Sequence, residues 1–184
     1  KMSILKEKIK FTYDDYLRLP DDGKRYQVIE GEVHMVPAPT PYHQNSLIKL
    51  LFLLRMFVGE HRLGEVYCAP CDVVLSREDV VQPDIFFISK EREHIITEKN
   101  IQGAPDLVIE ILSSSTAKLD RALKTKLYEK FRIKEYWLVD LEGKEIEILF
   151  LKGKNYESLG VYGIKQSFES PLLKGFKLDL KEIF

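Results

Sequence analysis

Residues 106–112 read Asp-Leu-Val-Ile-Glu-Ile-Leu, an apolar run with one acid at its start and a second near its middle. Successive side chains of a strand point to opposite faces of its sheet. Leu107, Ile109 and Ile111 therefore share one face, and the face that carries Glu110 is otherwise apolar as well. Because both faces are apolar, we predict a central strand of a sheet that is covered on both sides.

Glu110 is the exception on this strand. A carboxylate among apolar side chains costs several kcal/mol unless a cation or hydrogen-bond donors meet it. A structural ion pair with Arg or Lys meets that requirement, and so does a bound metal ion. The strand alone does not decide between these two readings.

Residues 83–88 read Pro-Asp-Ile-Phe-Phe-Ile and predict a second strand. Alternation places Asp84 on the same face as Phe86 and Ile88. An aspartate at the head of a strand is most simply a solvated residue. Its functional reading depends on whether another acid lies nearby, which the neighbouring strand with Glu110 supplies.

Residues 117–131 predict a helix that follows the N-cap cluster Ser-Ser-Ser-Thr at 113–116. Its apolar stripe consists of Leu119, Leu123, Leu127 and Phe131. Asp120 and Lys124 fall on this core-facing arc, four residues apart. An i,i+4 ion pair accounts for their spacing, but it does not account for their position on the buried side.

Two carboxylates on apolar strands and a lysine on the next helix form a coherent hydrolytic set. Oxygen ligands suit Mg²⁺ or Mn²⁺, and such a cation polarises a phosphodiester and acidifies a bound water. A nearby lysine can orient that water or stabilise charge on phosphorus. We therefore expect Asp84 and Glu110 to be metal ligands and Lys124 to be the third catalytic residue.

The motifs around Asp84 and Glu110 resemble the paired PD and (D/E)XK strands of the PD-(D/E)XK, restriction-endonuclease-like nuclease superfamily. More narrowly, the chain is similar to the Uma-type restriction endonuclease family. The similarity runs through residues 26–32, 64–75, 80–88, 103–140 and 170–173. The resemblance implies an α/β fold with a mixed β-sheet core, flanking helices and additional β-hairpins. It also implies Mg²⁺- or Mn²⁺-dependent cleavage of DNA phosphodiester bonds. The length of 184 residues fits one domain spanning residues 1–184.

Two positions depart from the pattern. The standard motif has a lysine two residues after the glutamate, where this chain has Leu112. In the Uma-type pattern the lysine has moved to the following helix, and Lys124 matches it. The family commonly shows glutamate at Gln27, so an ancillary acidic role there is either lost or passes to Glu30 or Glu32.

Two further polar residues match family positions. His43 stands at the start of a long helix, where it could contact a phosphate or simply form a hydrogen bond that begins the helix. Gln82 could contact substrate or support Asp84. A second class of function remains open: a weakened nuclease-fold module that binds DNA or a protein partner, since fold alone does not fix activity.

Charge and hydropathy constrain the setting. With 28 basic and 29 acidic residues and a formal net charge of -1, the chain has no general basic character, although a local patch can still bind phosphates. The helix predicted at 43–60 is apolar nearly all round, so we expect it to be buried in the fold or in a homodimer. No segment is long enough to span a bilayer and no signal peptide is evident, so we expect a cytoplasmic protein.

Cys68 and Cys71 are the two cysteines of the chain and raise a redox or metal alternative. A thioredoxin-like pair sits at a helix N-terminus, but this pair runs into a strand-like segment. A closed zinc site needs four ligands, and there is no second pair. We interpret both cysteines as small hydrophobic residues. The remaining elements that we predict are a helix at 13–19, a hairpin at 26–29 and 32–36, strands at 66–67, 72–75, 135–140 and 145–151, and a loop with a short helix at 91–102.

Overall fold

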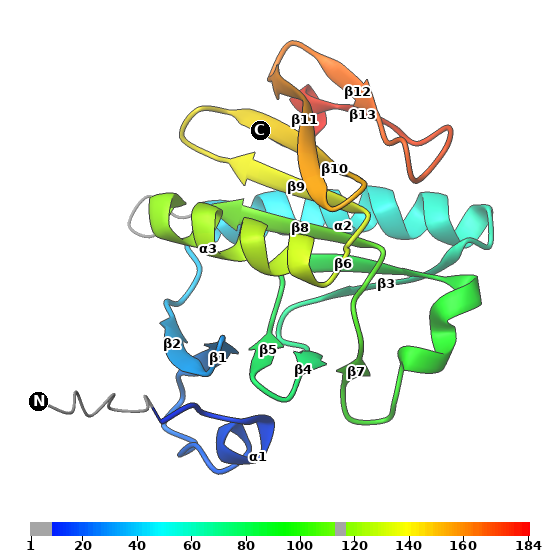
Figure 1. Ribbon diagram of the computed structural model, residues 1–184. Coiled ribbons are helices and arrows are strands. Elements are labelled where there is room, and N and C mark those ends of the chain that lie inside the picture. Colours follow the sequence, from blue (N-terminus) through cyan, green and yellow to red (C-terminus); the bar gives the residue numbers. More distant parts are fainter. Residues whose placement is uncertain (1–8, 113–116) are drawn as a thin grey trace, which may run out of the picture.

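The computed structural model describes residues 9–112 and 117–184, with the backbone alone for residues 117–120. The N-cap cluster expected at 113–116 lies outside these residues. Within them the chain forms a mixed α/β fold, as predicted, with helices packed against its larger sheet (Figure 1).

The larger sheet has six strands in the order β11-β10-β9-β8-β6-β3. Its strands are β3 (Gly64–Cys68), β6 (Ile85–Ser89), β8 (Leu107–Leu112), β9 (Glu135–Asp140), β10 (Glu145–Lys152) and β11 (Asn155–Gly163). β8 and β9 run parallel, while the other neighbours are antiparallel. A parallel pair needs a crossover, and α3 (Ala117–Lys130) provides it.

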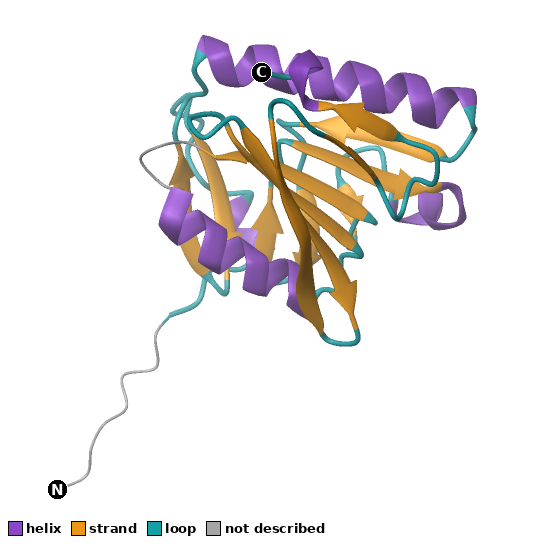
Figure 2. Ribbon diagram, turned by 90° about the horizontal axis from the view of Figure 1, so that it is seen from above, coloured by secondary structure: helices purple, strands orange, loops and turns teal. Residues whose placement is uncertain are grey.

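The two longest helices cover opposite faces of this sheet (Figure 2). α2 (Pro41–Glu60) packs Leu50 and Leu54 against the face that carries Ile109. α3 packs Leu127 against the face that carries Val108. The prediction that β8 is a central strand buried on both faces is confirmed.

The smaller sheet has five strands in the order β2-β1-β5-β4-β7. Its strands are β1 (Arg25–Ile29), β2 (Glu32–Val36), β4 (Val73–Ser76), β5 (Asp79–Val81) and β7 (Ile101–Gln102). The predicted hairpin is present, and its turn residues Glu30 and Gly31 have φ angles of 53° and 79°, as two-residue hairpin turns require. β5 and β7 were not predicted, because segments of three and two residues carry no readable periodicity.

The remaining elements are short. They are α1 (Tyr13–Tyr16), η1 (Lys90–Ile95), β12 (Ser167–Glu169), β13 (Lys177–Asp179) and η2 (Leu180–Glu182).

α2 is longer than predicted, because it begins at Pro41, two residues before the predicted start, with Thr40 as its N-cap. Proline suits the first helical turn because its φ is already helical and its missing N–H is not needed there. Among the described residues, no helix has the length and hydrophobicity to cross a membrane.

A buried carboxylate, Asp106, fixes the N-terminal end of β8. It accepts a hydrogen bond from the Ser89 backbone N–H at 2.9 Å and faces Lys134 Nζ at 2.8 Å and Arg92 Nη1 at 3.4 Å. Burial raises its pKa, but the hydrogen bonds from Lys134 and Ser89 outweigh burial, so the pKa lies below its ordinary value of 3.8. Asp106 therefore ties β8, β6 and the approach to β9 together as an ion.

We expect Asp106→Asn to lower the free energy of unfolding at pH 7 by about 2 kcal/mol, because a buried ion pair loses one partner. The contribution of this carboxylate is fully present above its unfolded pKa of about 3.9 and is lost as the pH falls through the lower folded value. Urea unfolding of both proteins should therefore show a difference in the free energy of unfolding at pH 7, and this gap should narrow below about pH 4. Asp14→Asn, at an exposed surface ion pair, is the control and should change stability by less than about 0.5 kcal/mol. A constant gap at all pH values would contradict the assignment.

Candidate active site

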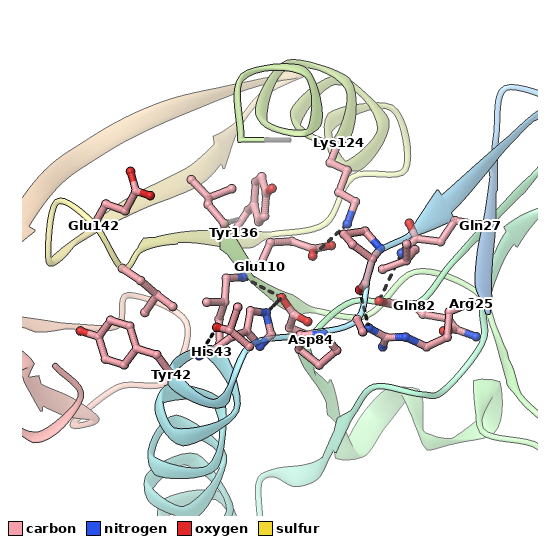
Figure 3. A pocket seen from close by; sticks show the side chains of 18 residues that line it. Arg25, Gln27, Tyr42, His43, Gln82, Asp84, Glu110, Lys124, Tyr136 and Glu142 are labelled. Carbon is pink, nitrogen blue, oxygen red and sulfur yellow. Dashed lines mark hydrogen bonds and ion pairs between the residues drawn. The ribbon is translucent and has the colours of Figure 1, made fainter. Parts of the chain in front are cut away.

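A cavity of about 350 Å³ lies where β8 ends, where the chain enters β6 and where α2 begins (Figure 3). Its lining combines polar residues with apolar and aromatic ones. The polar members are Arg25, Gln27, Thr40, His43, Gln82, Asp84, Glu110, Lys124 and Glu142, and the others are Val36, Pro37, Ala38, Pro39, Tyr42, Ile111, Leu112, Tyr136 and Leu141. The predicted residues Asp84, Glu110 and Lys124 therefore share one cavity.

Asp84 stands immediately before β6 and is held from two sides. Its Oδ2 accepts a hydrogen bond from the Ile111 backbone N–H at 2.8 Å, and His43 Nε2 lies 3.3 Å from the same oxygen. Its side chain is only 14% exposed. The simple reading of a solvated aspartate at a strand start is therefore wrong, because the C-terminal half of β8 and the start of α2 enclose this carboxylate.

Glu110 lies on the α3 side of β8 and has a protein partner for each carboxylate oxygen. Lys124 Nζ is 2.9 Å from Oε2, and the Tyr128 hydroxyl donates to Oε1 at 2.6 Å. The ion pair that the sequence allowed is present, and its cation is the predicted catalytic lysine. Burial raises the pKa of Glu110, while the positive charge of Lys124 opposes that rise.

Lys124 reaches Glu110 from the face of α3 that the sequence placed toward the core, and its side chain is 12% exposed. Leu112, which occupies the lysine position of the standard motif, also lines the cavity. Lys124 thus reaches from α3 into the cavity that Leu112 of β8 also lines. The side chain of Asp120 lies outside the described part of the chain.

Two of the predicted supporting residues, His43 and Gln82, line the cavity, and so does Gln27. His43 contacts Asp84, and Gln27 is 3% exposed with its amide nitrogen 3.5 Å from the Gln82 backbone oxygen. Gln82 donates from Nε2 to Asp72 Oδ1 at 2.8 Å and to the Tyr16 hydroxyl at 3.2 Å. These contacts hold the segment that leads into Asp84, so Gln82 has a supporting position.

Glu30 and Glu32 do not reach the cavity, which corrects the expectation that one of them replaces an acid at position 27. Ile29 pairs with Glu32 at the turn of the hairpin, whereas Arg25 pairs with Val36 at its open end. The open end lines the cavity, and the turn carries Glu30 and Glu32 exposed at the far end. The two acids do not reach the site because they lie at the opposite end of the hairpin.

Several residues in or beside the cavity were not singled out as site residues from the sequence. Tyr128, which lies outside the cavity lining, holds Glu110, and its place one helical turn after Lys124 could have indicated this contact. Burial and the nearby Glu110 charge raise the pKa of Tyr128, so its hydroxyl remains a donor. Arg25 and Tyr42 carried no signal, because only the fold brings β1 and the first turn of α2 together.

The two carboxylates fit a hard divalent cation. Mg²⁺ is commonly bound by one or two carboxylates together with waters and substrate phosphates. Among the described side chains, those of residues 9–112 and 121–184, no group of three or more His, Cys, Asp and Glu residues gathers. Asp84 and Glu110 would therefore hold such an ion as a pair, with its other ligands coming from outside their side chains.

Comparison with known proteins places this arrangement in a family. The profile of Uma2, described as "Putative restriction endonuclease", matches residues 13–181. The chain belongs to the Uma2 family. An uncharacterised protein of Synechocystis sp., sll1609, is 24% identical over 132 residues, which cover 70% of this chain and 74% of that protein.

The fold of this Uma2-family protein is shared with a solved structure. A crystal structure described as a putative nuclease belonging to DUF820, from Anabaena variabilis, superposes with a TM-score of 0.78 at 20% identity. The match covers 95% of this chain and 97% of the other. The predicted family and the restriction-endonuclease-like fold class are both confirmed.

The two cysteines of the Uma2-family protein do not form an activated thiol site. Cys68 ends β3, Cys71 follows in the next turn, and both are free. Burial raises the pKa of both thiols, with a further contribution from Asp84 at Cys68 and from Asp72 at Cys71. A raised pKa disfavours the thiolate that redox chemistry needs, which agrees with the interpretation of these residues as packing residues.

Proposed function

We propose that this Uma2-family protein is a divalent-metal-dependent endonuclease that hydrolyses DNA phosphodiester bonds. One observation carries the proposal: the acid that immediately precedes β6, an acid of the neighbouring strand β8 and a lysine from the crossover helix converge on a single cavity. The family description and the nuclease description of the solved relative support the same reaction class. We propose that the protein is cytoplasmic and that its substrate is DNA.

In this proposal Asp84 and Glu110 would hold Mg²⁺ or Mn²⁺, which would polarise the phosphodiester and acidify a water molecule. Lys124 stabilises the negative charge that develops on the phosphoryl oxygens. The Ile111 N–H and His43 keep Asp84 oriented, and Tyr128 does the same for Glu110. The oxygen of water becomes bonded to phosphorus, the bond from phosphorus to the leaving sugar oxygen breaks, and that oxygen takes up a proton.

The direct test is incubation of the purified chain with labelled DNA in Mg²⁺, in Mn²⁺ and in EDTA. We expect cleavage products that carry a 5′- or 3′-phosphate in the presence of either metal ion and none in EDTA. Products in EDTA would contradict the role of the metal ion. A complete lack of products in every condition would contradict the endonuclease assignment.

A second function has specific support: a nuclease-fold module that binds DNA or a protein partner without cutting. Gln27 lines the cavity where the family commonly has glutamate, and both oxygens of Glu110 already have protein partners. Binding of labelled DNA in Mg²⁺ without any strand cleavage would favour this alternative.

We also propose that the protein is a homodimer that associates through α2. The inner side of this helix packs on the sheet, but Ile48, Phe52 and Met56 are 60%, 61% and 57% exposed on its outer side. These residues are four apart and form one apolar stripe. A helix stripe of this kind can pair with its own copy about a twofold axis.

We expect light scattering at micromolar protein to give twice the mass of one chain, and Phe52→Lys to give a single chain. A lysine at the centre of the stripe would place a charge in the apolar contact, which the paired state cannot solvate. Val161→Lys, at another exposed apolar position on β11, should leave the dimer intact. A wild-type protein with the mass of one chain would refute the homodimer.

A further inference from the structure

The groups assigned to catalysis are recessed. The side chains of Asp84, Glu110 and Lys124 are 14%, 7% and 12% exposed, and that of His43 is 12% exposed. A phosphodiester can contact side chains so enclosed only if it enters the cavity together with part of its own nucleotide.

The cavity has room for little more than one nucleotide. Its volume of about 350 Å³ falls at the lower end of the range of about 300–1,000 Å³ for sites that take small molecules. A space of this size suits one nucleotide that has left the stack, as in enzymes that extrude a base before reaction, better than a base pair that remains stacked in a duplex.

The walls have the chemistry of a site for an unstacked base. One wall is the apolar segment from Val36 to Pro39, and Leu112 and Leu141 line the cavity as well. Tyr42, at the start of α2, is 41% exposed and is an aromatic member of the cavity lining. Bases stack on such rings with little dependence on sequence.

The cavity lining extends to both sides of the two carboxylates. Figure 3 shows Tyr42 and Glu142 on one side of Asp84 and Glu110, and Arg25 and Gln27 on the other. Among the described lining residues, Arg25 and Lys124 are the cations. Two cations in the lining fit a local contact with the phosphates of a short stretch of strand.

We propose that the cavity accepts an unpaired nucleotide beside the scissile phosphodiester and that Tyr42 is the surface on which its base stacks. Single-stranded DNA, or duplex DNA with locally unpaired bases, is then the preferred substrate. This inference rests on the proposed endonuclease function and specifies its substrate class.

The test compares three labelled DNAs of one sequence in Mg²⁺ and in Mn²⁺: a single strand, a fully paired duplex, and a duplex with a short central unpaired loop. We expect the single strand and the loop to be cut at least about tenfold faster than the paired duplex, because unpairing is already complete in both. Cleavage in the looped duplex should fall within the loop.

Variants at Tyr42 give a second readout. We expect Tyr42→Ala to raise the KM for the single strand about tenfold while kcat stays within about twofold, and Tyr42→Phe to restore the KM because stacking needs only the ring. Phe11→Ala is the matched control, since Phe11 is 40% exposed and lies outside the cavity lining. A merely structural role of Tyr42 would lower thermal stability and kcat together, and that result would overturn its assignment.

The possible failures are distinguishable. If the paired duplex is cut as fast as the single strand, the inference falls and the endonuclease function stands. If none of the three DNAs is cut with either metal ion, the proposed function falls and takes the inference with it.

Discussion

Asp84→Asn should abolish both metal binding and DNA cleavage, with a loss of activity of about a thousandfold or more. The metal ion supplies several kcal/mol of charge stabilisation in the transition state, and each 1.36 kcal/mol corresponds to about tenfold in rate. Asparagine keeps the size of the side chain and an oxygen that can accept the Ile111 N–H. The substitution therefore removes the negative charge with little change in shape.

Titration calorimetry with Mn²⁺ is the measurement for this variant, together with cleavage in the same buffer. Asp21→Asn changes an exposed aspartate outside the cavity lining and should match the wild type in both assays. Equal metal binding by Asp84→Asn and the wild type would refute the role of Asp84 as a ligand. Urea unfolding of the variant should show that its fold persists.

Lys124→Met should separate cleavage from metal binding. We expect cleavage to fall by about a hundredfold or more, as when a group that stabilises transition-state charge is removed. Metal binding should be retained or become tighter, because Lys124 Nζ, 2.9 Å from Glu110 Oε2, competes with a cation for that oxygen. Opposite effects on the two measurements are not expected from general loss of structure.

The matched control is Lys126→Met, which removes an exposed lysine from the same helix. It should leave cleavage and Mn²⁺ affinity unchanged. If Lys124→Met cuts DNA at the wild-type rate, Lys124 serves only as the structural partner of Glu110. If Lys124→Met loses metal binding instead, the ion pair with Glu110 organises the metal site, and Lys124 does not compete with the metal ion for Glu110.

Alternation along strands and helix periodicity were sufficient to predict the centre of the fold. Glu110 and Lys124 were placed on the correct faces of β8 and α3 because side-chain direction follows from local geometry alone. The family resemblance added the order of the motifs. The same reasoning missed the partners that come from distant segments, such as His43 beside Asp84, because loop paths between elements have no periodic signal.

The hairpin shows what local sequence patterns cannot predict, which is how an element is oriented relative to the site. Its strands and turn were predicted, yet nothing in residues 25–36 tells which end of the hairpin faces the site. The structure turns Arg25 and Val36 toward the cavity and carries Glu30 and Glu32 away. Register within an element is local information, whereas the docking of that element depends on contacts between side chains far apart in sequence.

The ion pair between Glu110 and Lys124 has a consequence for the life of the protein before it meets a metal ion. A buried carboxylate with a cation and a hydroxyl already beside it needs no further charge to be tolerated in the interior. Folding therefore does not wait for Mg²⁺ or Mn²⁺, unlike the folding of domains whose structure forms only around an ion. In the proposed function the cation would therefore enter a protein that is already folded, and its binding would add stability without being required for folding.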